Sequence, residues 1–274
     1  MKTINAESNP AQAQQMLSDV MSIVNETSQE IQEEVELEIK DSLDPIVTLP
    51  GGYVKFSGEV VTSVEVRELN GRDEEALAKT TSTEKLVNEV LIRGTVSIGS
   101  EKATEEILNN LLSGDRDYLM LKIFQATFGP TLEVSPYCST CAEAVTAEIN
   151  LETGVPVRKL DSPHDRKFSV AISRGEAKCE LPTGHTQRLL IGAAGKSVSE
   201  LSTILLSNTV TQVRGVDVIA PSQVLELSIR DRRKLGDEIL SRVPGPQFQD
   251  TTCTCPGCGG TLEVPLSIAN LFRF

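Results

Sequence analysis

The amino-acid sequence predicts an α+β fold in which helices are mixed with short antiparallel hairpins, and a four-cysteine zinc ribbon joins the two ends of the C-terminal domain. Apolar residues recur at helical spacing in several stretches that capping residues, glycine or proline delimit. Pairs of short segments with period-2 alternation surround glycine-containing turns, as in β-hairpins. Two Cys-x-x-Cys pairs lie far apart in the chain, and together they offer four thiolates to one metal ion.

The net charge of −13 argues against a nucleic-acid partner, because binding to phosphates draws on clustered Lys and Arg. No apolar stretch approaches the roughly 20 residues that cross a bilayer, and the first residues lack the apolar core of a signal peptide. We therefore expect a soluble protein made in the cytoplasm, without membrane insertion. The absence of Trp and the 4% aromatic content leave little for base stacking and favour protein partners.

We expect three parts: an acidic helical arm over residues 1–44, a small β-hairpin and helix unit over residues 45–100, and a zinc-clamped α+β domain over residues 101–274. In the arm, apolar residues recur at spacings of three, four and seven, as in an amphipathic helix: Met16, Leu17, Val20, Met21, Val24, Ile31 and Val35. The other positions are rich in Asp and Glu, so an isolated helix would suffer from like-charge neighbours. Both a solvated arm and a helix docked on another subunit fit this pattern.

The unit over residues 45–100 opens with a predicted linker or turn, because residues 45–52 contain two prolines and a Gly-Gly pair. Partial alternation then predicts a hairpin of strands 53–57 and 59–66 around Gly58. A helix is expected to start at Asn70 or Gly71, since the acidic residues of its first turn suit the helix dipole. A second helix over residues 82–90 and a returning strand over 91–98 complete the unit.

Two helices open the predicted zinc-clamped domain. Residues 101–113 place their apolar side chains on one helical face. Asp115 can cap the next helix, whose dense apolar content from Tyr118 to Phe128 makes it the expected core element. Gly129-Pro130 should end this helix, as a glycine cap followed by proline does.

The rest of the domain is predicted as hairpins and helices around the cysteines. Strands 131–137 and 143–151 flank the first cysteine pair, and strands 168–172 and 177–181 form another hairpin. A helix follows Ser197 or Ser199, a β-branched run over 209–219 turns at Gly215, and a helix runs from Ser228 to Arg242. The break Pro244-Gly245-Pro246 leads to strands 247–252 and 261–265. Residues 186–194 are weakly patterned, and residues 266–274 form a short apolar tail.

Cys138, Cys141, Cys255 and Cys258 are the predicted metal ligands, and Zn²⁺ is the predicted ion. Each pair has the two-residue spacing that lets neighbouring thiolates chelate one ion. Four thiolates fill a tetrahedral shell, which is a structural rather than a catalytic arrangement. The second pair lies in a glycine-rich segment that suits a knuckle turn, whereas the first pair lacks the glycine. Cys253 is the rival ligand, although its single-residue separation from Cys255 makes a poorer chelate turn.

The remaining candidates for chemistry lie outside any recognisable motif. Spacing gives Cys179 no chelating partner, so we expect a small buried residue there. His164 and His185 belong to no ligand motif. A thioredoxin-like role for either cysteine pair would need a helix opening in a βαβ pattern, and both pairs are flanked by predicted strands. Because no phosphate loop or nucleophile–base constellation is recognisable either, we do not expect an enzyme.

Four features occur in one order along the chain. They are the core-helix segment Asp115-Arg116-Asp117-Tyr118-Leu119, the first cysteine pair followed by Ile149-Asn150-Leu151, a late helix that ends before Pro244, and Cys255-Pro256-Gly257-Cys258-Gly259 ahead of Phe272 and Phe274. This order resembles that of the baseplate hub proteins of contractile-tailed, T-even-type bacteriophages. The shorter segment from Arg67 to Glu75 resembles an opening common in phage tail-assembly and baseplate proteins.

The resemblance implies a structural component of the central hub of a phage tail baseplate, synthesised in the host cytoplasm and located in the virion. It implies partners among other baseplate and tail subunits, contacted through the N-terminal arm and the apolar C-terminus. A non-virion chaperone of tail and baseplate assembly is the alternative. A zinc-ribbon adaptor of unrelated cellular origin is a third hypothesis.

Overall fold

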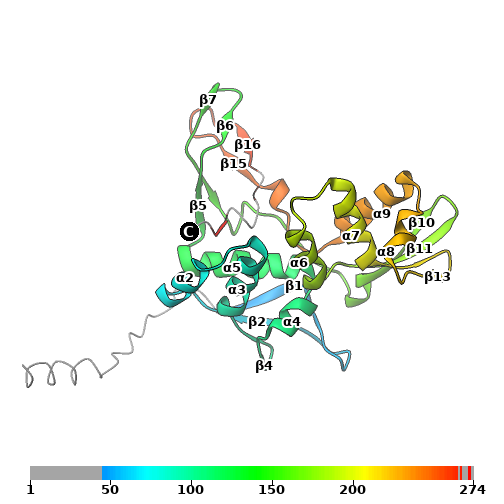
Figure 1. Cartoon of the computed structure of the whole chain (residues 1–274). Coiled ribbons are helices and arrows are strands. Elements are labelled where there is room, and N and C mark those ends of the chain that lie inside the picture. Colours follow the sequence, from blue (N-terminus) through cyan, green and yellow to red (C-terminus); the bar gives the residue numbers. More distant parts are fainter. Residues whose placement is uncertain (1–44, 265, 267–270, 273–274) are drawn as a thin grey trace, which may run out of the picture. The chain divides into compact units, whose positions relative to one another are not determined.

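The computed structural model describes residues 45–264, 266, 271 and 272, which belong to one compact unit over Leu43–Phe274 (Figure 1). The described part has the predicted α+β architecture, in which helices accompany antiparallel sheets. The predicted helical arm over residues 1–44 lies outside the described residues and stays a prediction.

The first sheet is antiparallel and has the order β1-β2-β3-β4. Its strands are β1 Ile46–Val54, β2 Val60–Val66, β3 Thr95–Ile98 and β4 Glu101–Lys102. The predicted hairpin around Gly58 is confirmed, and Gly58 has the positive φ of 85° that favours glycine in such a turn. Val64 and Val66 of β2 are buried on the inner face of this sheet, as the period-2 pattern requires.

The predicted linker or turn over residues 45–52 is wrong, because residues 46–52 belong to the first strand. β1 begins at Ile46, and its register against β2 shifts around Pro50. Residues 49–52 are buried there, and the Gly51 N–H donates a 2.6 Å hydrogen bond to Asp115 Oδ1. The proline and glycines that signal a turn therefore mark an irregularity inside an edge strand. An edge strand tolerates proline, whose backbone has no N–H to donate to a neighbouring strand.

Helices α2, Gly71–Leu77, and α3, Thr83–Gly94, connect β2 to β3. Asn70 caps α2 in a capping box, and the Ser82 side chain caps α3, as the acidic and polar starts of these segments predict. The returning strand begins only at Thr95, because α3 continues past the predicted end at residue 90. Leu91 is completely buried on the inner side of α3, which explains why the helix extends through it.

Helix α5, Ser113–Phe128, is the central helix and contacts β1, α3 and β14. The preceding α4, Glu105–Asn110, is shorter than predicted, because Thr104 caps it and the residues before Thr104 pair as β4. The predicted capping role of Asp115 is wrong, since Leu112 holds the N-cap position and Asp115 is fully buried in the first turn. Gly129, with φ 92°, ends α5 as predicted.

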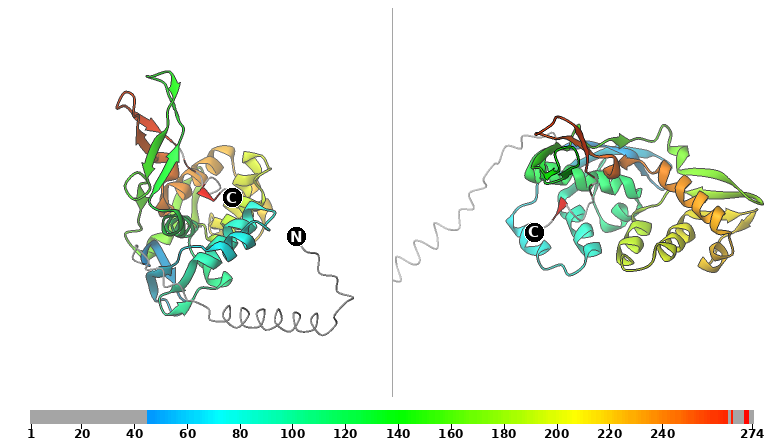
Figure 2. Two further views of the ribbon diagram at one scale, coloured as in Figure 1. Left: turned by 90° about the vertical axis from the view of Figure 1, so that its left-hand side faces the viewer. Right: turned by 90° about the horizontal axis from the view of Figure 1, so that it is seen from above.

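A second antiparallel sheet has the order β10-β11-β12-β13. It consists of β10 Lys167–Ile172, β11 Gly175–Glu180, β12 Val210–Val213 and β13 Val216–Asp217, and it is accompanied by α6 Gly184–Gly192, α7 Val198–Thr209, α8 Pro221–Leu225 and α9 Ile229–Arg242. Both views of Figure 2 show α7 (yellow) beside α9 (orange). The predicted helix starts at Ser197 and Ser228 are confirmed, whereas α6 arises from the weakly patterned residues 186–194.

Short two-stranded ladders complete the described part. They are β5 Thr131–Val134 with β8 Ala147–Asn150, β6 Tyr137–Cys138 with β7 Glu143–Ala144, β9 Val157–Arg158 with β14 Gly245–Pro246, and β15 Thr252–Thr254 with β16 Thr261–Glu263. The strand predicted over residues 247–252 is largely wrong, because Phe248–Asp250 form a 3-10 turn before β15. The short helix η2 over Pro163–Arg166 precedes β10.

Two hydrophobic clusters form the core. The larger one joins side chains of β1, β2, α3, α5 and the ladders that carry the cysteines, and the smaller one lies between the second sheet, α7 and α9. The larger cluster draws residues from both sides of position 100, and the predicted domain boundary there stays a prediction. Among the described residues, no helix combines the length and the hydropathy that a membrane span requires.

Candidate metal centre

The two cysteine pairs lie at the ends of neighbouring ladders. Cys138 ends β6 and Cys141 follows it at the tip of the β5–β8 hairpin, and Cys255 and Cys258 lie between β15 and β16. Figure 1 shows both tips side by side in one projection (green and orange-red), and contacts between β15 and β8 join their bases. The fold therefore brings together thiols that are 114 or more residues apart in the chain.

The geometry of the four sulfurs fits a tetrahedral ion. All four Sγ atoms lie within 4.8 Å of one another, and the Cys138–Cys258 and Cys141–Cys255 Sγ pairs are each 3.8 Å apart. Four thiolates at about 2.3 Å from one Zn²⁺ in a tetrahedron would be separated from each other by about 3.8 Å. The four cysteines can therefore hold one metal ion of that size.

The backbone of each tip supports the sulfur positions. The Cys141 N–H donates to Cys138 Sγ over 3.5 Å, and this donation lowers the pKa of Cys138 to about 7. On the other tip, the Gly259 N–H donates to the Cys255 carbonyl oxygen over 2.9 Å and closes the turn. Cys138 and Cys255 are 1% exposed, while Cys258 is exposed, so the site lies at the surface with its inner ligands shielded.

Ala142 adopts a left-handed backbone conformation that normally favours glycine. Gly259, after the second cysteine pair, has φ 71°, and Ala142, after the first pair, has φ 57°. Both tips therefore have a left-handed residue immediately after the second cysteine, although only one of them has glycine there. An L-residue in this conformation costs about 1–2 kcal/mol, so the first tip carries local strain.

We expect Ala142→Gly to raise the free energy of unfolding of the metal-loaded protein by about 0.5–1 kcal/mol, because glycine adopts φ 57° without the Cβ clash. Chemical denaturation measures the change. Gly259→Ala, at the corresponding position of the other tip, should lower stability by a similar amount. A destabilising Ala142→Gly substitution would show that the conformation of this residue carries no strain.

The other predicted candidates lie away from the four sulfurs. Cys253 faces the larger core, where it pairs with Leu262 across the β15–β16 ladder and is 9% exposed. Cys179 is buried in the smaller core as expected, and burial raises the pKa of its thiol to about 11. Within the described part, His164 and His185 are exposed and join no cluster of metal-ligating groups.

The first turn of α5 holds buried charges whose contacts the sequence does not reveal. Burial raises the pKa of Asp115 to about 7, and its Oδ1 accepts from Gly51. The Arg166 guanidinium donates to the carbonyl oxygens of Gly51 and Gly52, so β1 is held between an acid and a base. Arg116 is fully buried and donates to the Leu108 carbonyl oxygen over 3.0 Å. The only sequence signal was three consecutive charged residues, 115–117, in an apolar helix.

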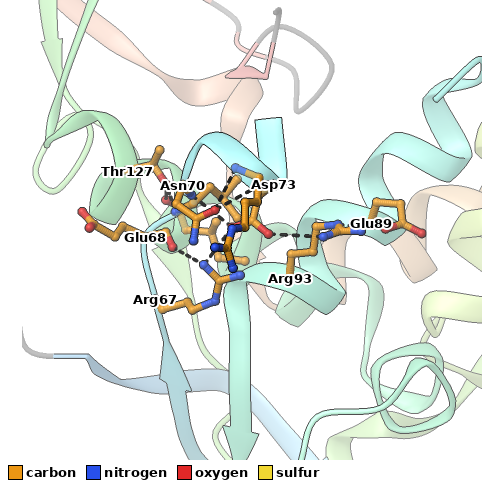
Figure 3. A network of polar contacts seen from close by, with 10 residues as sticks. Arg67, Glu68, Asn70, Asp73, Glu89, Arg93 and Thr127 are labelled. Atoms are coloured by element: carbon orange, nitrogen blue, oxygen red, sulfur yellow. Dashed lines mark hydrogen bonds and ion pairs between the residues drawn. The ribbon is translucent and has the colours of Figure 1, made fainter. Parts of the chain in front are cut away.

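A second buried network lies in the segment that resembles a phage-protein opening (Figure 3). The Asp73 carboxylate is 5% exposed and pairs with Arg67 at 2.8 Å and with Arg93 at 3.3 Å. The Asn70 N–H donates to the same carboxylate, and the Thr127 hydroxyl of α5 accepts from the Leu69 N–H. The network therefore ties α2 to the end of β2, to α3 and to α5.

Asp73→Asn should lower the free energy of unfolding by about 1–2 kcal/mol, because both arginines lose their common acidic partner. The loss is no larger because both arginines are partly exposed and water solvates them. Burial alone would raise the pKa of Asp73, but hydrogen bonds from Arg67 and the Asn70 backbone outweigh it and lower the pKa. The stabilisation is therefore present above about pH 4, the unfolded-state value, and is lost as the pH falls through the lower folded-state pKa.

Denaturation at several pH values measures this contribution. The difference in stability between the wild type and Asp73→Asn should shrink as the medium becomes more acidic than pH 4. Glu89→Gln is the matched control, since Glu89 is a more exposed partner of Arg93 and should contribute at most about 0.5 kcal/mol. Equal effects of the two substitutions would contradict a special role for the buried carboxylate.

Comparison with known proteins gives one finding. Residues 47–169 match the family model described as T4 bacteriophage base plate protein, and no curated protein and no solved structure matches the chain significantly. The matched segment runs from β1 through α5 to β10 and contains the Asp73 network and the first cysteine pair, but not the second. This match supports a phage baseplate protein of the T4 type.

Proposed function

We propose that the protein is a structural subunit of the central hub of a phage tail baseplate. One observation carries the proposal. The four-cysteine cluster joins the segment that matches the baseplate family to the C-terminal Cys-Pro-x-Cys-Gly motif, which lies outside that segment. The order of core helix, first cysteine pair, late helix and second pair is the order that resembles the hub proteins. The subunit is synthesised in the host cytoplasm and remains in the virion tail.

In this proposal Zn²⁺ has a structural role. Cys138, Cys141, Cys255 and Cys258 would hold it, and four protein ligands leave no open position for a reacting water. The ion would fasten the β15–β16 ladder to the hairpin that follows α5. We accordingly propose that the protein acts by binding other subunits and not by catalysis.

Quantitative mass spectrometry of purified phage particles tests the hub assignment. A hub subunit should be present in a fixed ratio to the other baseplate proteins in every preparation. A chaperone of assembly, the alternative, would be found in infected cells but not in finished particles. A chain that co-purifies only with host proteins would support a cellular zinc-ribbon adaptor and would contradict both baseplate functions.

The acidic N-terminal segment gives a further prediction. Deleting residues 1–44 should leave a folded protein that still binds zinc, because the four cysteines and both described cores lie outside the deleted segment. The truncated protein should fail to enter particles, since the apolar stripe from Met16 to Val35 is proposed to contact a neighbouring subunit. Complementation of a deletion phage measures this, and normal assembly with the truncated protein would contradict the role of the arm.

A further inference from the structure

The four sulfurs of the candidate metal centre form two close pairs across the tips. Cys138 Sγ lies 3.8 Å from Cys258 Sγ on the other tip. Cys141 Sγ likewise lies 3.8 Å from Cys255 Sγ. The partners are 120 and 114 residues apart in the chain, and all four are free thiols in the structure. The sulfurs that can chelate one ion are therefore also placed in two pairs, each of which bridges the tips.

A disulfide in either pair needs only a short approach of the two sulfurs. The S–S bond is about 2.05 Å long, so each pair must close by roughly 1.7 Å, which lies within reach of side-chain rotation. No side chain at position 257 separates the tips, because a Cβ on Gly257 would lie only 3.2 Å from Cys141 Sγ. Contacts between β15 and β8 hold the bases of the tips together. The sulfurs can therefore meet without separation of the two ladders.

Each pair joins one accessible cysteine to one shielded cysteine. Cys258 is exposed, whereas Cys138 beside it is buried. In the other pair, Cys141 is half-buried and Cys255 is buried. An oxidant in solution therefore reaches one sulfur of each pair first, and the second sulfur waits 3.8 Å away. This is the arrangement of a redox-sensitive cysteine next to the cysteine that resolves it.

A disulfide within one Cys-x-x-Cys pair is the competing product. It would form inside a turn that is already closed by hydrogen bonds, from the Cys141 N–H to Cys138 Sγ and from the Gly259 N–H to the Cys255 carbonyl oxygen. It would also leave the two tips unconnected. A bond across the tips keeps both turns as they are, and the two 3.8 Å contacts favour it.

We infer that two disulfides, Cys138–Cys258 and Cys141–Cys255, form across the tips when a peroxide oxidises this site, and that they replace the metal ion as the clamp. The exposed Cys258 thiolate attacks one oxygen of hydrogen peroxide and becomes a sulfenic acid as hydroxide leaves. The Cys138 thiolate then attacks Cys258 Sγ, the S–S bond forms, and a second hydroxide leaves. Each bridge thus reduces one peroxide with two electrons, and the ion loses its thiolate ligands.

The sulfur positions carry this inference, and its role in a particle rests on the proposed function. The host cytoplasm keeps thiols reduced, whereas the surface of a virion is oxidising. A zinc clamp made during synthesis would become a covalent clamp after release of the particle. Because each bridge closes a loop of more than 100 residues, it should hold the β15–β16 ladder to the β5–β8 hairpin without any metal.

Titration of the full-length, zinc-loaded protein with hydrogen peroxide tests the inference. About two equivalents of peroxide should release about one equivalent of zinc, because each bridge consumes one peroxide. Mass spectrometry of unreduced peptides should then identify both bridges across the tips. A chelator should lower the Tm of the reduced protein by roughly 6 °C or more and leave the Tm of the oxidised protein unchanged. A dithiol reductant with added Zn²⁺ should reverse the oxidation.

Two variants test the pairing itself. Cys258→Ser removes one accessible sulfur, so it should form only the Cys141–Cys255 bridge, whether or not it still holds zinc. Cys179→Ser is the matched control and should form both bridges, because Cys179 lies in the smaller core. Bridges within a tip, sulfinic acids without any bridge, or an oxidised protein that a chelator still destabilises would each overturn the inference.

The outcomes also separate this inference from the proposed function. A protein that binds no zinc but forms both bridges would overturn the zinc assignment and support the inference. Purified phage particles, alkylated before lysis, supply the second arm. Absence of the chain from the particles would overturn the hub assignment and leave the titration result standing. Its presence there with four alkylated cysteines would show that the released particle does not use the bridges.

Discussion

Replacing Cys255 with serine should remove the bound metal and open the projection that carries both cysteine pairs. Cys255 is 1% exposed, and its Sγ lies 3.8 Å from that of Cys141, so the substitution removes a shielded ligand from the centre of the cluster. In zinc-finger peptides the apparent free energy of zinc binding is roughly 10–16 kcal/mol. Because this protein keeps its other contacts without the metal, the substitution should lower its free energy of unfolding by only a part of that amount. We expect a loss of at least about 3 kcal/mol, which corresponds to a fall in Tm of roughly 6–12 °C for a domain of this size.

Elemental analysis and thermal denaturation of the purified variants measure both effects. The wild type should contain about one equivalent of zinc, and less than about half an equivalent in undamaged protein would count against the four-thiolate site. A chelator should reproduce the loss of stability in the wild type, and added Zn²⁺ should restore it. Neither treatment should change the Tm of Cys255→Ser.

Two other cysteines serve as controls. Cys179→Ser should keep full zinc content, because Cys179 lies in the smaller core and belongs to no metal-ligating cluster in the described part. Cys253→Ser should also keep its zinc, at some cost in stability, because the Cys253 side chain packs in the larger core. Loss of zinc from Cys253→Ser with retention in Cys255→Ser would transfer the ligand role to Cys253.

Local signals in the sequence were sufficient for elements whose ends are defined by one capping side chain. Asn70, Ser82, Ser197 and Ser228 each accept hydrogen bonds from the first turn of a helix in the structure. The predicted starts were Asn70 or Gly71, residue 82, Ser197 or Ser199, and Ser228, so each observed cap lies at a predicted start or is one of its two alternatives. The hairpin of β10 and β11 was likewise predictable, because period-2 alternation and a glycine turn both occur within a few residues.

The errors occur where a distant contact determines the local structure. Residues 49–52 have the composition of a turn, yet they form part of a strand because Asp115 and Arg166 supply hydrogen bonds to Gly51 and Gly52 from other elements. No pattern within residues 45–52 contains that information. Helix α6 was missed because its apolar residues make a weak stripe, in which Leu189 is exposed and Leu190 is half-buried.

The candidate metal site was predictable in its residues but not in its backbone. The two-residue spacings alone identified the four cysteines that the fold brings within 4.8 Å of one another. Cys253 was the rival of Cys255, because the two would point to the same side of a continuous strand, but β15 ends at Thr254 and Cys253 packs in the larger core. The left-handed conformation of Ala142 was not predictable, since alanine rarely adopts it without support from its surroundings.

Gly114→Ala should lower the free energy of unfolding more than Gly259→Ala or Gly236→Ala. Gly114 lies in the first turn of α5, where an added Cβ would be 1.5 Å from the Pro244 carbonyl oxygen and 2.7 Å from its carbon. The opposing residue, Gly245, has φ 113°, and a Cβ on it would be 2.3 Å from the Gly114 carbonyl oxygen. Two backbones meet here without any side chain between them, so neither can yield by changing a rotamer.

The contact between Gly114 and Gly245 positions the chain that leads to the second cysteine pair, because β14 follows α9 and precedes β15. Separating α5 from β14 by the width of a methyl group should therefore cost at least about 3 kcal/mol and lower the zinc content of the expressed protein. Gly236→Ala is the matched control, because its Cβ would meet nothing within 4 Å in the middle of α9, and it should raise stability by about 0.5–1 kcal/mol. Urea denaturation of the two variants measures both changes, and a Gly114→Ala protein as stable as the wild type would show that α5 and β14 do not meet at this distance.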